Sequence, residues 1–266
     1  MIITNFNNWN GYQFGNKIIG LNNLIQISKF YNQDYFFTEF NGLELFEVGN
    51  KTREYNKEQY EILDVNFLIK NKFEVSLDND KIYYLEPSLL EYFYEFSTLS
   101  TYDIFKYKNI DLTKKNVAIH FRGGDFHQWD PKSILPFEYY KNSIDFVRSE
   151  INEEDYNYIL FSDDTNLESY IKTIEYLNFL KIGYSTGNVS NFKEDFTKIS
   201  ECKYVISSPS TFVISASFCG NKNKKIIHSY DWVVNYKNNS DYFRDVFWKE
   251  LYRNGGNNDY KFYKLI

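Results

Sequence analysis

The sequence is poor in the residues that most often reveal a protein class. Its 266 residues include two cysteines, one methionine, four prolines and three histidines. Cys202 and Cys219 could pair in principle, but they have no metal-ligand spacing and Cys202 lies in an apolar segment. We therefore favour buried free thiols in a reducing compartment. A disulfide framework is not needed either, because a chain of this length buries enough surface to fold without one.

Long runs of apolar residues and of basic residues are also missing. No apolar run approaches the roughly 18 residues that predict a membrane-spanning helix, and the first residues lack the pattern of a secretory leader. No long block of Lys and Arg interrupts a chain of formal net charge -6, which argues against binding nucleic acid through many phosphates. We expect a soluble, cytoplasmic protein without a nucleic-acid partner. Association with the inner face of a membrane stays open.

The motifs of three large enzyme classes are missing as well. There is no Walker loop, no Gly-x-Ser-x-Gly nucleophile elbow and no zinc-ligand spacing. Tyr and Phe, in contrast, are abundant, with 25 of each. Such residues can stack on sugar rings, but their even spread along the chain fits core packing better than a binding platform.

From about residue 112 onward, short apolar segments alternate with amphipathic ones. We expect strands over 116–121, 157–164, 179–185, 203–208 and 224–229, and helices over 136–151, 167–177, 194–202, 209–220 and 241–252. This alternation predicts an α/β layer with a mostly parallel sheet. In such sheets ligands bind outside the carboxyl ends of the strands.

The first part of the chain has a less regular pattern. A helix is expected over 16–33 and a strand over 34–40, and further helices over 87–100 and 101–110. The helix over 16–33 begins with Gly15 and Asn16, which form the turn into it and are candidates to face a ligand.

The segment HFRGGD follows the predicted strand 116–121 and combines several polar residues. Arg122 offers a planar fork of donors that suits a phosphate, and Gly123 and Gly124 allow the backbone to approach a ligand closely. His120 and Asp125 flank them. The alternative is a turn at the end of a strand with an Arg–Asp surface pair, and the spacing alone favours neither.

Two further polar clusters follow predicted strands. In FSDD, Asp163 and Asp164 could accept the donor edge of a guanine base or the ribose hydroxyls, or one of them could cap the next helix. In SSPSTF, Ser210 or Ser208 would cap a helix whose first amides, those of Thr211 and Phe212, are expected to be free and to suit an anion. Ordinary helix capping is the favoured interpretation of the first cluster and the strongest alternative for the second.

Taken together, these segments resemble the α-1,2-fucosyltransferases of glycosyltransferase family 11. The H-x-R-x-G-D signature of that family stands as HFRGGD, its Tyr-Tyr-containing helix as LPFEYYKNSIDFV, and its strand with Ser-Asp-Asp as YILFSDD. A later family run stands as DFTKISECKYVISSPSTF, so four motifs keep their order across residues 116–220. Two positions depart from the pattern: Gly123 stands where the family usually has a second arginine, and Val213-Ile214-Ser215 replace Trp-Trp-Gly.

The resemblance implies a fold of the GT-B type, in which two Rossmann-like domains face a cleft. Residues 1–111 would form the acceptor-side domain and residues 112–266 the domain that binds the GDP-sugar donor. The implied reaction is an inverting transfer of L-fucose from GDP-β-L-fucose to a glycan hydroxyl. The expected linkage is α-1,2, and the expected process is surface glycan assembly. It requires no metal and no further cofactor.

The resemblance also implies roles for the candidate residues. Arg122 and the helix start at Ser210 and Thr211 would stabilise the charge that builds on the β-phosphate of the leaving group. The remaining donor-site candidates are His120, Asp163, Asp164, Phe212 and Asn16.

The general base of the reaction stays open. Asp125 is the first candidate, and the alternative is that it orients Arg122; His127 and Glu39 are weaker candidates. Two other functions are also open: transfer from another GDP-hexose, and carbohydrate binding without catalysis.

Overall fold

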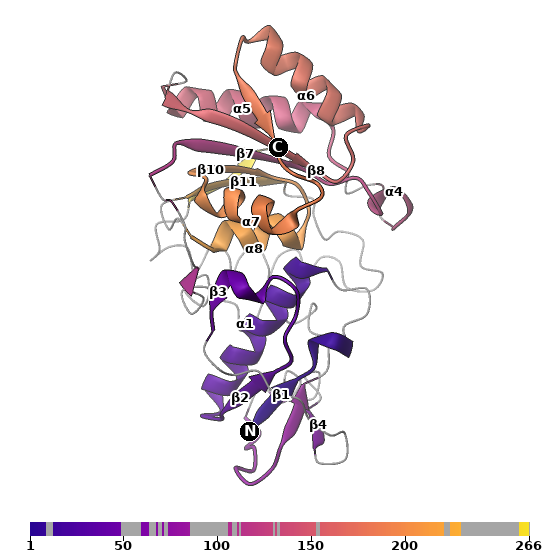
Figure 1. Ribbon diagram of the computed structural model, residues 1–266, viewed down its shortest axis with the longest axis vertical. Helices are drawn as coiled ribbons and strands as arrows, with labels where there is room; N and C mark the ends of the chain where they lie inside the picture. The colour runs from indigo at the N-terminus through magenta and orange to yellow at the C-terminus, as the bar shows by residue number, and fades with distance from the viewer. Residues whose placement is uncertain are drawn as a thin grey trace. The chain divides into compact units, whose positions relative to one another are not determined.

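A computed structural model describes two compact units of the chain, Met1–Lys108 and Asn109–Ile266. The described residues are 1–8, 13–48, 60–63, 68, 71, 74–85, 106–107, 111, 113–129, 131, 134–152, 155–220, 224–229 and 261–265. The helices expected over 87–100 and 241–252 lie outside them. Each unit has its own parallel sheet (Figure 1).

The first unit is built on a four-stranded parallel sheet with the order β2-β1-β5-β4. Its strands are β1 (Ile2–Thr4), β2 (Tyr35–Phe37), β4 (Glu61–Leu63) and β5 (Tyr83–Leu85), and α1 (Phe14–Phe30) connects β1 to β2. Two 3-10 turns, η1 (Phe6–Asn8) and η2 (Leu43–Leu45), and the antiparallel pair β3 (Phe46–Glu47) and β6 (Lys106–Tyr107) complete it. The expected helix 16–33 and strand 34–40 are confirmed as α1 and β2. The helix expected over 101–110 is wrong at β6, because those two residues pair with β3 instead.

The second unit holds a six-stranded sheet in which all neighbouring strands are parallel. Its strands are β7 (Asn116–Phe121), β8 (Asn157–Ser162), β9 (Tyr184–Thr186), β10 (Tyr204–Ser207), β11 (Lys225–Ser229) and β12 (Lys261–Leu265). They lie in the order β12-β11-β10-β7-β8-β9. The chain thus starts in the middle at β7, moves outward to β9, and returns to β10 on the other side of β7. This is the strand order of a Rossmann-like fold.

Helices cover both faces of this sheet (Figure 1). On one face lie α5 (Phe137–Glu150) and α6 (Glu168–Phe179), which contact each other, and on the other lie α7 (Phe192–Glu201) and α8 (Thr211–Phe218), which also contact each other. The short helix α4 (Phe126–Trp129) follows β7. Every residue of β7 is buried, as expected for the central strand of a sheet that is covered on both faces.

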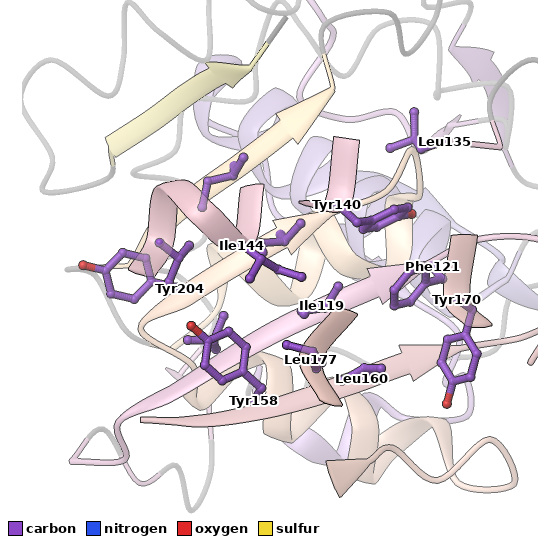
Figure 2. Packing of buried hydrophobic residues seen from close by; sticks show 14 of the residues in the cluster. Ile119, Phe121, Leu135, Tyr140, Ile144, Tyr158, Leu160, Tyr170, Leu177 and Tyr204 are labelled. Carbon is purple, nitrogen blue, oxygen red and sulfur yellow. The ribbon is translucent and has the colours of Figure 1, made fainter. Parts of the chain in front are cut away.

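The core beneath α5 and α6 follows from the alternation of side chains along the strands. Ile119 and Phe121 of β7 face Tyr140 and Ile144 of α5, and Leu160 of β8 extends the same layer (Figure 2). The ring of Phe121 stacks on that of Tyr140, with centroids 4.2 Å apart. This packing fixes the direction in which β7 leaves the sheet.

The strand expected over 179–185 begins later than the sequence pattern suggested. Phe179 is the last residue of α6, and the strand in this region is β9, which begins only at Tyr184. Between them Lys181 adopts a left-handed conformation with φ 57, and Leu180 and Ile182 pack against the core. These apolar residues therefore close a helix, although their pattern resembled a strand.

Candidate functional site

Most of the predicted site residues lie at the carboxyl edge of the second sheet, where β7 and β10 are neighbours. The strand order reverses between these two strands, and this is the position at which α/β sheets bind ligands. His120 lies near the end of β7 and Arg122 directly follows it, while β10 leads through Ser208 and Ser210 into α8. The sheet thus brings together two sequence motifs that are almost ninety residues apart.

His120 connects the two strands. Its Nδ1 lies 2.6 Å from the hydroxyl oxygen of Ser208, and its ring is tilted against that of Phe212, with centroids 6.1 Å apart. The side chain is buried. Burial, together with the nearby Arg122 guanidinium, lowers the pKa of His120 to about 3. The imidazole is therefore neutral, with one ring nitrogen as a donor and the other as an acceptor.

Arg122 is held from three sides. Its Nη1 donates to Asp163, its Nη2 donates to Asp125 at 2.6 Å, and its guanidinium lies over the ring of Phe126, 5.0 Å from the centroid. Asp163 also accepts the backbone N–H of Gly123 at 2.8 Å. A guanidinium has five N–H donors, and these two ion pairs use two of them. The others could bind a ligand oxygen.

The two glycines of the signature are required by their surroundings. Gly124 has φ 29, and a Cβ there would lie 2.6 Å from Oδ2 of Asp163. A Cβ at Gly123 would lie 2.9 Å from the Cβ of Asp164 and from both methyl carbons of Leu167. A side chain at Gly123 would therefore require Asp164 and Leu167 to shift.

Asp164 takes a different partner from Asp163. Its Oδ2 lies 2.9 Å from Nε2 of His127, and its Oδ1 accepts the amide of Asn166 at 2.9 Å. These hydrogen bonds, the backbone one first, lower the pKa of Asp164. The alternative that Asp163 or Asp164 caps the next helix is wrong, since α6 has Leu167 at its N-cap and no side-chain cap.

The start of α8 confirms one of the two predicted caps. Ser210 is the N-cap, and its hydroxyl accepts the amide of Phe212 at 3.3 Å, while Ser208 binds His120 instead. The expectation that the amide of Phe212 is free is therefore wrong. Thr211 is the first residue of the helix, and its amide lies at the positive end of the helix dipole.

Two residues that support this edge were not predicted. The hydroxyl of Tyr139 on α5 donates to the carbonyl oxygens of Ser207 at 2.8 Å and Ile227 at 3.1 Å, which connects β10 and β11. Asp195 on α7 is buried, and its Oδ1 accepts the amide of Asn188 at 2.6 Å. Burial raises the pKa of both Tyr139 and Asp195. Their segments, the Tyr-Tyr helix and the acidic start of DFTKISEC, were the available signals in the sequence.

Two predicted residues belong to the first unit. Asn16 lies in the first turn of α1, and Glu39 is exposed just after β2. Their part in a site with the second unit stays a prediction. Within the described ranges, no group of three or more His, Cys, Asp and Glu side chains is arranged to hold a metal ion. None of the helices in that part of the chain is long and apolar enough to cross a membrane.

Comparison with known proteins adds one match. A family model described as glycosyl transferase family 11 matches residues 50–249, which is well over half of the chain. The matched range contains the whole edge formed by β7, β8, β10 and the start of α8. No curated protein matches the chain.

Proposed function

The chain belongs to glycosyl transferase family 11, and from this premise we propose that it transfers L-fucose from GDP-β-L-fucose to a glycan hydroxyl. Membership makes it a glycosyltransferase of the fucosyl-transferring type, which uses a nucleotide-sugar donor and a glycan acceptor. The proposal adds the donor, inversion at the anomeric carbon, an α-1,2 linkage and a role in surface glycan assembly. It also includes a GT-B arrangement, in which the first unit receives the acceptor.

The observation that carries the proposal is the position of Arg122 at the switch point of the sheet, after the strand β7 whose neighbour β10 leads into α8. Departure of GDP builds negative charge on its β-phosphate, and fixed N–H donors stabilise such charge best when they are already in place. The guanidinium has unused donors, and the N-terminus of α8 adds the favourable end of a helix dipole. Together they would supply what a metal ion supplies elsewhere, so we propose that no metal is required.

The charges around Arg122 restrict how it binds a phosphate. Two carboxylates, those of Asp125 and Asp163, already pair with it, so the net charge of this cluster does not attract an anion. Binding must therefore depend on directed, charge-assisted hydrogen bonds from the guanidinium. Asp125 is the more exposed of the two carboxylates that pair with Arg122, with 61% of its side chain exposed against 30% for Asp163.

The other candidate residues receive roles that fit their contacts. We propose that the neutral ring of His120 meets the guanosine part of the donor, beside Phe212. Asp163 holds Arg122 and the Gly123 amide together. For Asp125 we propose the second of its two predicted roles, orientation of Arg122, because protonation as a base would break its ion pair.

The first experiment is calorimetric binding of GDP, UDP and CMP to the wild-type protein, with and without a chelator. We expect selective GDP binding that survives the chelator. Arg122→Ala should weaken it by about 100-fold, the loss expected for charged hydrogen bonds. Arg148→Ala near the end of α5, at the opposite edge of the sheet, is the matched control. Wild-type affinity in Arg122→Ala, or no nucleotide binding by folded wild-type protein, would contradict the proposal.

A second candidate donor is another GDP-hexose, and the observation that favours it is Gly123. Where the family usually has a second arginine, Gly123 offers no side chain to the sugar. Its neighbours Asp164 and Leu167 would have to shift to admit one. Competition between GDP-fucose and GDP-mannose in one transfer assay separates the two donors. A carbohydrate-binding module without catalysis would bind glycan but no nucleotide in the same calorimetric series.

A further inference from the structure

A histidine and a carboxylate form a second pair beside the ion pairs of Arg122. Nε2 of His127, on α4, lies 2.9 Å from Oδ2 of Asp164, which follows β8. The neighbouring residue Asp163 binds Arg122. Two adjacent carboxylates thus hold a guanidinium and an imidazole at the same edge of the sheet. The side chain of His127 is 53% exposed, whereas that of Asp164 is 20% exposed.

The carboxylate of this pair is fixed and ionised. Its Oδ1 accepts the amide of Asn166 at 2.9 Å. The hydroxyl of Ser162 donates to the backbone oxygen of Asp164 at 2.8 Å, and the amide of Asp164 lies 3.1 Å from the same hydroxyl oxygen. An ionised carboxylate can only accept hydrogen bonds, so Nε2 of the neutral imidazole carries the proton. Nδ1 is then left with its lone pair.

We infer that His127 is the general base that deprotonates the acceptor hydroxyl, with Asp164 as its positioning residue. The inference rests on the proposed function. As the hydroxyl oxygen attacks C1 of the fucosyl group, its proton passes to Nδ1 of His127. The bond from C1 to the β-phosphate oxygen breaks, and its electron pair leaves with GDP towards Arg122. The imidazolium faces the carboxylate of Asp164 and releases its proton to water after the product has left.

The surroundings favour this role for His127 over Asp125. The carboxylate of Asp125 accepts a hydrogen bond from Nη2 of Arg122 at 2.6 Å. If Asp125 took up a proton, the guanidinium that receives the leaving phosphate would lose this ion-pair partner. The charged group in contact with His127 is Asp164, 2.9 Å from Nε2, while the charges of Asp125 and Asp163 are directed to Arg122. The imidazolium that forms therefore faces a carboxylate, which stabilises it. An imidazole also suits general-base catalysis near neutral pH better than a carboxylate does.

Kinetics of matched variants test the inference. GDP-fucose is the donor and lactose the acceptor, with water as acceptor if lactose is not used, since water must also lose a proton. We expect His127→Gln to keep the wild-type Kd for GDP within about twofold and to lower kcat by about 100–1000-fold. Asp164→Asn should lower kcat less while keeping the Kd for GDP within about twofold, and it should release the tautomer of the imidazole, so that the proton is no longer confined to Nε2. Gln128→Ala, an exposed neighbour on α4, is the control and should leave kcat and KM unchanged.

The outcomes separate the two hypotheses. Wild-type kcat in His127→Gln, with GDP binding intact, would overturn the base assignment and leave the proposed function standing. Absence of GDP binding by the wild type would overturn both. Nitrogen NMR of the imidazole gives an independent readout that needs no acceptor: we expect the proton on Nε2, and a proton on Nδ1 would overturn the assignment.

Discussion

At the scale of single residues, His120 shows how burial sets the protonation state of a site residue. Its imidazole lies between Ser208 and Phe212, and burial together with Arg122 lowers its pKa from 6.5 to about 3. A neutral ring keeps an acceptor nitrogen that an imidazolium would lack. The same burial makes folding depend on pH.

We predict that the wild-type protein loses stability on mild acidification through His120. Because the folded pKa lies below the unfolded one, the unfolded chain takes up a proton below pH 6.5 that the folded chain does not. Stability therefore falls as pH decreases, by about 1.4 kcal/mol per unit, or about 2 kcal/mol by pH 5. Urea unfolding of wild type and His120→Gln at several pH values measures this: the variant should lose about 2 kcal/mol less. Parallel curves would contradict the prediction.

Residue types at strand ends could be predicted from the sequence, but their partners could not. Asp163 and Asp164 are equivalent in the sequence, yet one binds Arg122 and the other His127. Ser208 and Ser210 were equally good caps, and only Ser210 is one. Which partner a side chain reaches depends on how the chain turns after each strand, and one or two residues of a turn decide it.

At the scale of elements, one lysine joins the ends of two helices. Lys224 is fully buried, and its Nζ lies 3.1–3.3 Å from four carbonyl oxygens, which share its three N–H donors; they belong to Ile199, Ser200, Ala216 and Cys219. These carbonyls lie at the C-terminal ends of α7 and α8, where a positive charge is favourable. Burial lowers the pKa of Lys224 to about 8, so the ammonium still predominates at neutral pH.

We predict that Lys224→Met destabilises the protein by about 1–3 kcal/mol, because buried carbonyls at two helix ends lose their donor. Methionine keeps the length and apolar stem of lysine, so little packing is lost. Urea unfolding at neutral pH is the measurement. The control is Lys203→Met, at a half-buried lysine that directly precedes β10. Equal stability of both variants and the wild type would show that the helix ends do not need the ammonium.

Helix ends also show what the pattern of a sequence can and cannot predict. In α1 the chain reverses at Asn32, with φ 50 and a hydrogen bond from Gln33 to the carbonyl of Ser28 at 2.8 Å. Asparagine tolerates this conformation, and the predicted end at residue 33 was close. In α6 the same turn uses Lys181, with Ile182 bonded to Leu177 at 2.9 Å. Lysine gives no such signal, so the sequence pattern at this helix end indicates a strand. The three-residue strands β1 and β4 have no recognisable period in the sequence, whereas β2, of the same length, lies in a longer aromatic segment that indicates a strand.

At the scale of the whole molecule, each unit contains a sheet and a hydrophobic core of its own. The cluster around Ile119 and Ile144 is drawn entirely from the second unit, and Leu21 of α1 is fully buried within the first. The α/β class and the parallel second sheet were predicted from the alternation after residue 112, because continuous apolar strands and amphipathic helices each have a distinct pattern. The sheet of the first unit was not, since its strands are short.

We predict that the two units unfold in separate transitions in scanning calorimetry and that GDP acts on only one of them. A ligand stabilises the part that binds it, by about 2.7 kcal/mol at 100 times its Kd, so GDP should raise the transition of the second unit. Ile144→Ala should destabilise the second unit and lower its transition temperature, and Leu21→Ala should do the same to the first unit. Each should cost about 2–5 kcal/mol of unfolding free energy, because each side chain is buried in the core of its own unit. If GDP instead raised the transition that Leu21→Ala lowers, the donor would bind to the first unit, and the assignment of Arg122 to the diphosphate would fail with it. A single transition moved by all three changes would mean that the two cores unfold as one cooperative unit.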